Sequence, residues 1–428
     1  MKIASLSTDQ APPISVPLRF FAVAPLFLVL AALMLATGGN SSFEAARSPA
    51  ILAAVHCITL GFMTMIMMGA TQQILPVVLG SKVPASAVVA WFTFLPLLAG
   101  AILLPLGFGL GKPELFNFAW PLLAVAFLVF IGSSLISLAH APAQNASKTA
   151  ILLSILALAG AVTCGVLLAR GYATGLALPY AKLATAHVSM ALGGWVMLLI
   201  IGVSYQVVPM FQLTPNYPKW LMASLAPAIS GSLLLNLLVL LPEAAPRWAE
   251  IVAESLFWLW STTFAVVTLR LQNQRRRRVA DATLTFFRLG MFSLLCSALL
   301  SMMSLLMPAT ELLRMLAALV FLLGFAMSLI HGMLYKIIPF LVWFHLFRGG
   351  SNTRIPNMKE IIPEPWMWRH LMLHGSTLLA ALLQPFWNVA GWLVIPGLLL
   401  QGILLSYAVF TGVTVYRRTL ARIERVPA

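Results

Sequence analysis

The sequence predicts a polytopic, all-α membrane protein, and three observations support this fold class. The chain has 428 residues, of which 61% are hydrophobic and only 9% are charged. Its mean hydropathy is +0.96. A soluble domain cannot bury so much apolar surface, whereas a bilayer requires about 20 apolar residues for each helix. The third observation is a glycine and proline pattern that occurs three times, at a spacing of about 130 residues. We therefore expect one integral membrane domain over residues 1–428.

About twelve apolar runs are long enough to cross a bilayer, and several exceed the length of a straight span, so tilted helices are expected. The expected spans are residues 19–37, 50–79, 87–110, 115–138, 149–169, 182–211, 220–241, 248–269, 284–307, 312–338, 366–385 and 389–415. They leave a cytoplasmic amino-terminal segment (1–18), a polar cytoplasmic loop (348–365) and a cytoplasmic tail (416–428).

The second, sixth and tenth of these spans share one register. Aligned on one glycine, each has a second glycine eight residues later and a proline seven residues after that. The matched triplets are Gly61, Gly69 and Pro76; Gly194, Gly202 and Pro209; and Gly324, Gly332 and Pro339. Small residues at such positions allow helices to approach closely. The spacing between copies assigns roughly four spans to each repeat.

The distribution of lysine and arginine predicts the orientation. With a cytoplasmic amino terminus, the inner loops and tail hold Lys82, Lys148, Lys219, Arg275, Arg276, Arg277, Arg278, Arg348, Arg354, Lys359, Arg417, Arg418, Arg422 and Arg425. The outer loops hold a sparser set, Arg47, Lys112, Arg170, Arg247 and Arg314. Because cytoplasmic loops gather positive charge, both termini are expected inside. The same rule accounts for the net charge of +15, so no nucleic-acid partner is expected.

Two histidines make a candidate ligand pair near the outer face. His56 on the second span and His187 on the sixth lie 20 and 22 residues before their matched prolines. At a rise of about 1.5 Å per residue, they lie within about 3 Å of the same depth. Ionisable residues inside a membrane are energetically costly and usually functional, and neutral imidazole is a common metal ligand. The alternative is a pair of buried histidines that only form hydrogen bonds.

Three further histidines lie toward the cytoplasmic side. His331 is on the tenth span, and His370 and His374 on the eleventh are four residues apart, so these two share one helical face. In one interpretation, His331 holds a metal or a second haem together with His370 or His374. In the other, these histidines lie among lipid headgroups, because tryptophans and an arginine flank His370.

The sequence HVSMALGGWVMLLIIGVSYQVVP, residues 187–209, resembles the histidine-bearing helices of the catalytic subunit of haem-copper oxidases. The C-type oxidases and the related nitric oxide reductases are most similar. The resemblance implies twelve spans in three four-helix arcs with pseudo-threefold symmetry, and metal-binding histidines on spans 2, 6, 7 and 10. It covers most of the chain as architecture, but only about 25 residues per copy as a motif.

Under this resemblance, His56 corresponds to the axial ligand of the low-spin haem and His187 to the first copper ligand. The chain departs from the family elsewhere. Span 7 lacks the adjacent histidine pair, and Ala317 and Leu319 stand where span 10 of the family has two histidines. Ser189 stands where a second histidine would complete a pair with His187. We therefore expect no oxygen-reducing centre, and one haem between His56 and His187.

These expectations describe a haem-binding membrane redox protein with a b-type haem, and copper stays open as a second metal. Its role would be electron transfer, or chemistry related to nitric oxide or respiratory metal centres; whether it is an enzyme stays open. The expected partners are the lipid bilayer and a c-type cytochrome or another electron-transfer protein, in the bacterial cytoplasmic membrane. Arg47 and Lys182 are candidates for contacts with haem propionates. The alternative is a cofactor-free transporter or channel on the same scaffold.

Overall fold

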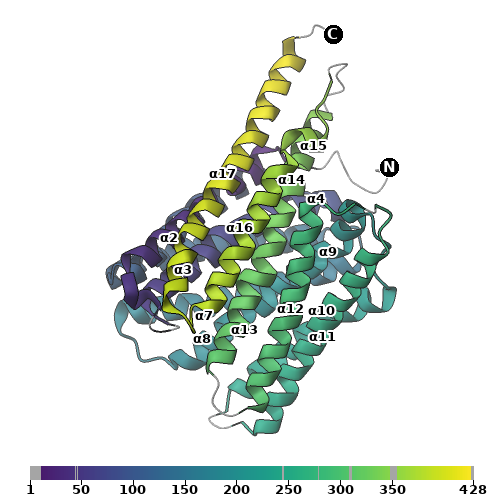
Figure 1. Ribbon diagram of the computed structural model, residues 1–428. Helices are drawn as coiled ribbons and strands as arrows, with labels where there is room; N and C mark the ends of the chain where they lie inside the picture. The colour runs from purple at the N-terminus through teal and green to yellow at the C-terminus, as the bar shows by residue number, and fades with distance from the viewer. Residues whose placement is uncertain are drawn as a thin grey trace.

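The computed structural model describes residues 11–43, 45, 47–242, 245–277, 279–307, 311–347 and 354–425, and within these residues all regular structure is helical (Figure 1). Eleven helical segments of the described chain are long and apolar enough to cross a membrane. The prediction of a polytopic, all-helical membrane protein is confirmed at this level.

The helices, in chain order, are α1 (Ser15–Val23), α2 (Leu26–Thr37), η2 (Gly39–Phe43), α3 (Pro49–His56), η3 (Cys57–Thr64), α4 (Met65–Leu79), α5 (Ser86–Gly109), η4 (Pro113–Leu115), α6 (Phe116–Ala139), α7 (Ala146–Thr174), α8 (Tyr180–Val188), η5 (Ser189–Val196), α9 (Met197–Gln212), α10 (Lys219–Leu240), α11 (Arg247–Asn273), α12 (Ala282–Leu306), α13 (Glu311–Leu319), η6 (Val320–Met327), α14 (Ser328–Phe347), α15 (Met358–Ile361), α16 (Glu364–Leu383) and α17 (Asn388–Arg425).

Two ends of the chain differ from the expected boundaries. The first span begins at Ser15 rather than near residue 19, and it is interrupted between α1 and α2 at Pro25, which has no N–H to donate. The last helix continues to Arg425, so much of the expected tail (416–428) is helical. Residues 1–10, 426–428, Arg278 and the part of the polar loop from 348 to 353 lie outside the described residues.

The residues of the expected eleventh span form α16, which packs against α17 and α12. It is not among the eleven apolar segments. Charged residues at Glu364 and Arg369 and the two histidines lower its hydropathy, although its length of 20 residues would suffice.

The repeat in the sequence is also a repeat in the backbone. Spans 2, 6 and 10 each contain an eight-residue π-helical segment, η3, η5 and η6. Each segment includes the first repeat glycine, Gly61, Gly194 or Gly324. A π-helix is rare and usually short, and it is frequent at functional sites. The three segments begin four, five and four residues before their glycines, so the backbone feature recurs within one residue of the same register.

Both glycines of each copy pack against the span that precedes it in the chain. A methyl group on the first glycine would lie 2.1 Å from Phe27, 2.4 Å from Ala157 and 2.6 Å from Ser293, in spans 1, 5 and 9 respectively. On the second glycine it would lie 2.9 Å from Phe20, 2.9 Å from Ala150 and 2.7 Å from Phe286, seven residues earlier on the same three spans. Since real Cβ atoms do not approach so closely, the missing side chains are what allow each pair of helices to touch.

The first described residues and the end of the last helix lie at the same end of the bundle. Nε2 of His345, near the end of α14, is 3.1 Å from the carbonyl oxygen of Pro12. In Figure 1, α17 continues past this end of α14 and projects beyond the bundle.

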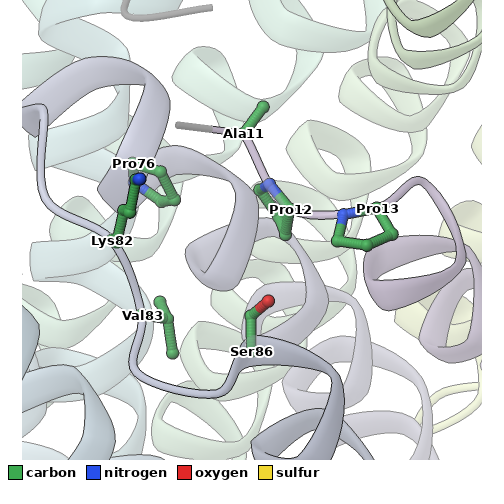
Figure 2. A pocket seen from close by; sticks show the side chains of 7 residues that line it. All are labelled: Ala11, Pro12, Pro13, Pro76, Lys82, Val83 and Ser86. Atoms are coloured by element: carbon green, nitrogen blue, oxygen red, sulfur yellow. The ribbon is translucent and has the colours of Figure 1, made fainter. Parts of the chain in front are cut away.

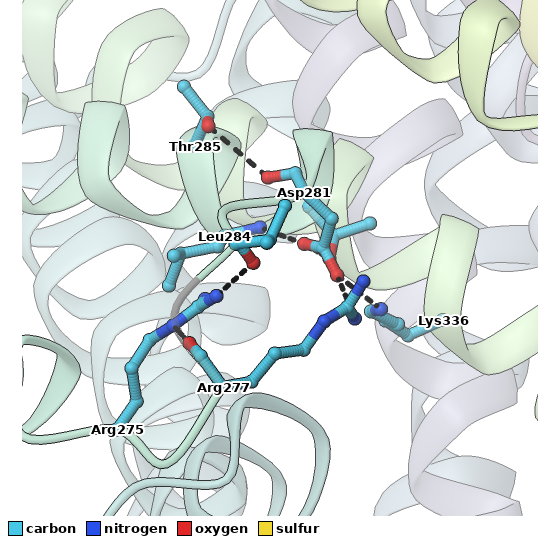
Figure 3. A network of polar contacts seen from close by, with 8 residues as sticks. Arg275, Arg277, Asp281, Leu284, Thr285 and Lys336 are labelled. Atoms are coloured by element: carbon cyan, nitrogen blue, oxygen red, sulfur yellow. Dashed lines mark hydrogen bonds and ion pairs between the residues drawn. The ribbon is translucent and has the colours of Figure 1, made fainter.

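A polar network also lies at this end, where Asp281 precedes α12 (Figure 3). Its carboxylate accepts hydrogen bonds from the Leu284 amide at 2.9 Å and the Thr283 hydroxyl at 2.7 Å, which caps the helix. It also forms ion pairs with Lys336 at 3.0 Å and Arg277 at 3.2 Å. Lys336 is on span 10, four residues after Gly332, so the network ties the third repeat to the start of span 9.

The network gives a pH-dependent stability. Burial alone would raise the pKa of Asp281, but the Lys336 ammonium and the Leu284 and Thr283 hydrogen bonds outweigh it and lower the pKa from 3.8 to about 2. Because the pKa of Asp281 is lower in the folded protein, its ionised carboxylate stabilises the fold. This stabilisation is fully present above the pKa of the unfolded chain, and it is lost as the pH falls through the folded pKa of about 2. We expect the detergent-solubilised protein to lose at most about 2 kcal/mol between pH 5 and pH 2 from this group, measured by thermal unfolding.

Asp281→Asn is the matched control for this experiment. Asparagine caps a helix about as well as aspartate, but it does not titrate. The variant should therefore be less stable than the wild type at pH 6 and lose this contribution to the acid dependence. An unchanged acid profile would contradict the assignment.

Candidate functional site

His56 and His187 lie side by side in the structure. His56 is the last residue of α3, and His187 is the penultimate residue of α8. Their ring centres are 6.4 Å apart, and the ring planes differ by only 20°. Rings in face-to-face contact would lie about 3.5–4 Å apart. The two imidazoles are thus neighbours without being in direct stacking contact.

A backbone carbonyl orients each ring. His56 Nδ1 lies 2.7 Å from the carbonyl oxygen of Leu52, one turn earlier on the same helix. His187 Nδ1 lies 2.8 Å from the carbonyl oxygen of Ala161, on span 5. Because a carbonyl only accepts, Nδ1 must donate in both rings, and the Nε2 of each neutral imidazole then carries a lone pair. Within the described residues, neither Nε2 has a hydrogen-bond partner.

Close packing determines the positions of the two rings. A methyl group on Gly165 would lie 2.9 Å from Cε1 of His187, so the glycine makes room for this ring against α7. On the other side of the pair, Phe108 is stacked on His56 with ring centres 5.5 Å apart. His56 is one residue before its π-helical segment, and His187 is two residues before its own. Measured from these segments, the histidines are offset by one residue instead of the two counted from the glycines.

The separation of the two ring centres matches, in length, two imidazoles on opposite sides of one iron or copper ion. An imidazole nitrogen binds a first-row metal at about 2 Å, and the ring centre lies roughly 1 Å behind it, so two ligands on opposite sides place their ring centres about 6 Å apart. The observed 6.4 Å is close to this value. A carbonyl bonded to the other ring nitrogen is also the usual support of a metal-binding histidine.

The two candidate propionate ligands are placed differently. The Lys182 ammonium donates to the carbonyl oxygens of Leu241 and Pro242 at 3.1 and 2.9 Å, so it caps the carboxyl end of span 7. Arg47 is exposed, just before α3. Within the described residues, neither basic side chain forms a hydrogen bond with His56 or His187.

His331, His370 and His374 form a buried cluster between spans 10 and 11. Their exposed fractions are 0%, 0% and 2%, which makes the headgroup interpretation wrong. Arg369 is exposed while His370 is buried, so α16 turns its charged side chain outward and its histidines inward. The ring of His331 lies 4.5 Å from that of His370 and 4.8 Å from that of His374, centre to centre.

The hydrogen bonds of the cluster are incomplete. His374 is fully bonded, with Nδ1 at 2.9 Å from the side-chain oxygen of Gln401 and Nε2 at 2.8 Å from the Ser328 hydroxyl. His370 has the Tyr335 hydroxyl at 2.9 Å from Nδ1, but its Nε2 has no partner. His331 has no partner on either nitrogen. As the side chains stand, no three His, Cys, Asp or Glu residues within the described ranges are placed to hold a metal ion.

A cavity of about 250 Å³ lies at the other end of span 2 from His56 (Figure 2). Pro12 and Pro13 face Pro76 across it, and Lys82 is its one charged lining residue. Pro76 is 20 residues from His56 along the same span, or about 30 Å at helical rise. The cavity is therefore separate from the histidine pair.

Several supporting residues of these sites were not identified from the sequence. Gly165 and the Ala161 carbonyl belong to span 5, and the only signal was a run of small residues in that helix. Gln401 and Ser328 were ordinary polar residues inside apolar spans. Intramembrane polar side chains usually form hydrogen bonds between helices. This rule predicts such bonds for Gln401 and Ser328, but it does not identify His374 as their partner.

The comparisons with known proteins give no assignment for this chain: no model of a known protein family matches it, and no curated protein matches it.

Proposed function

We propose that this chain is a membrane redox protein that holds one b-type haem between His56 and His187 and transfers electrons. One observation carries the proposal: two imidazoles at 6.4 Å, each with Nδ1 bound to a carbonyl and Nε2 without a partner among the described residues. The proposed scaffold has twelve spans in three four-helix arcs, with both termini cytoplasmic. The repeated glycine contacts of spans 2, 6 and 10 support it.

The proposed roles of the residues follow from their geometry. A bound haem supplies a one-electron iron couple. His56 and His187 would together hold the haem, and a haem held by two imidazoles would favour electron transfer over oxygen reduction. The Leu52 and Ala161 carbonyls fix the ring rotation and raise the basicity of both ligands. A c-type cytochrome or another electron-transfer protein would exchange electrons at the outer face of a bacterial cytoplasmic membrane. A role linked to nitric oxide or respiratory metal centres is compatible with this arrangement.

One observation favours the second candidate, a cofactor-free transporter or channel. Gln72, Gln73 and Tyr205 are buried at the inner ends of spans 2 and 6, and their side-chain polar atoms have no partner within the described residues. Gln72 and Tyr205 occupy matched positions of the repeat. Unpartnered buried polar groups are costly, and a water-filled or ion-conducting path would satisfy them.

A spectrum of the purified full-length protein distinguishes the two functions. We expect one haem b per chain, with a reduced-minus-oxidised difference spectrum typical of six-coordinate, low-spin iron. Haem is quantified by its pyridine adduct after expression in haem-sufficient cells. A colourless, monodisperse protein that also fails to take up added haem would exclude the redox proposal and favour the transporter.

A further inference from the structure

The cluster at His331 requires a partner that the side chains do not supply. Three imidazole nitrogens, two on His331 and Nε2 on His370, are buried with no hydrogen bond in the described residues. An unsatisfied buried polar atom destabilises the folded state, so three of them within one cluster call for an explanation. The side chain of His331 is fully buried, near the middle of the helical segment Glu311–Phe347.

The ring spacing suits imidazoles that share one ion. Two imidazoles at a tetrahedral angle around a first-row metal have ring centres about 5 Å apart, from a metal–nitrogen distance of about 2 Å. The observed distances from His331 are 4.5 Å to His370 and 4.8 Å to His374. Both distances are shorter than the 6.4 Å between the ring centres of His56 and His187, which we call the outer pair. They therefore fit ligands on one side of an ion better than ligands on opposite sides of a haem.

Hydrogen bonds to neighbouring side chains involve one ring nitrogen of His370 and both ring nitrogens of His374. The Gln401 amide nitrogen donates to the Gly397 carbonyl at 3.2 Å, which fixes the amide with its oxygen toward Nδ1 of His374. Nδ1 of His374 must then donate, and its Nε2 is an acceptor that the Ser328 hydroxyl now occupies. The Tyr335 hydroxyl lies 2.9 Å from Nδ1 of His370. In the tautomer in which this hydroxyl accepts, Nε2 of His370 carries a lone pair. Such outer partners are typical of metal-binding histidines.

The neutral groups around the three histidines favour a monovalent ion over a divalent one. The hydrogen-bond and ring partners of the cluster are aromatic or neutral, including Phe62, Phe286, Tyr335 and Gln401, and none is a carboxylate. A divalent ion would bring two uncompensated charges into the membrane interior, which is very costly. Imidazole suits zinc, copper, iron and nickel, and among these copper is the one with a common monovalent state.

We propose that His331 and His370 bind one Cu(I) ion within the membrane, with His374 as a third ligand when its Nε2 leaves Ser328. The site is separate from the outer pair. Measured from the matched glycines, His331 is 12 positions further along its span than His56, or about 18 Å at helical rise. Copper binding here does not depend on the proposed haem.

The test is anaerobic titration of the purified full-length chain with Cu(I) against a chromogenic Cu(I) chelator, with total copper measured by mass spectrometry. We expect one copper per chain in the wild type. His331→Gln and His370→Gln should each weaken binding by at least about tenfold. The control is His345→Gln on the same helix, because His345 already has the Leu341 and Pro12 carbonyls as partners; it should bind copper normally.

Further variants distinguish an effect on copper binding from an effect on haem binding or on folding. Ser328→Ala removes the competitor for Nε2 of His374, so it should bind Cu(I) at least as tightly as the wild type. His56→Ala should lose haem and keep copper, while His331→Gln should keep haem, which also shows that it folds. No stoichiometric Cu(I) in the wild type, or unchanged binding in both His331→Gln and His370→Gln, would overturn the proposal.

Discussion

Replacing either His56 or His187 with alanine is expected to reduce bound haem from one per chain to less than about one tenth. Each substitution removes one of the two imidazoles that are proposed to hold the haem and leaves a single ring in its place. Any haem that remains should be five-coordinate, so the low-spin spectrum should be lost together with the stoichiometry. The measurement is the haem-to-protein ratio after purification, combined with the reduced spectrum.

The chain offers a matched control for this experiment. His140 is exposed at the end of α6, and its Nδ1 contacts only the Ile136 carbonyl of its own helix. His140→Ala should therefore keep the full haem content. If the His56 and His187 variants both keep a six-coordinate haem, the outer pair is not the binding site, and the buried cluster at His331 becomes the candidate.

Long apolar runs made most of the fold predictable from the sequence. A helix that spans a bilayer must satisfy its backbone internally and cover about 20 apolar residues, so eleven segments could be located from composition. α16 shows the limit of this rule, because two exposed charged residues, Glu364 and Arg369, and two buried histidines lower its hydropathy. The break at Pro25 and the ten further residues of α17 after Val415 depend on local backbone and packing, which hydropathy does not report.

The site was predicted less completely than the fold. The depth of His56 and His187 followed from helical rise, but their mutual orientation depends on the π-helical segments, for which the sequence has no clear signature. His370 was ambiguous for a different reason. Its tryptophan and arginine neighbours belong to the outward face of α16, and sequence proximity does not show that the next residue points the other way. Only tertiary packing places it against His331.

A methyl group on the repeat glycines is expected to disrupt the contact between neighbouring spans. In Gly61→Ala, the new Cβ would meet the ring of Phe27, which is 3% exposed and cannot move aside without displacing α2 from η3. We expect the free energy of unfolding to fall by about 1–3 kcal/mol, the range for overpacking, measured by thermal unfolding in detergent.

The matched control is Gly132→Ala on α6, where a Cβ meets nothing within 4 Å. Its free energy of unfolding should rise by roughly 0.5–1 kcal/mol from helix propensity alone. Because His56 ends the helix that leads into η3, Gly61→Ala should also lower haem content while Gly132→Ala does not. Equal stability of the two variants would show that the threefold glycine contacts do not hold the spans together.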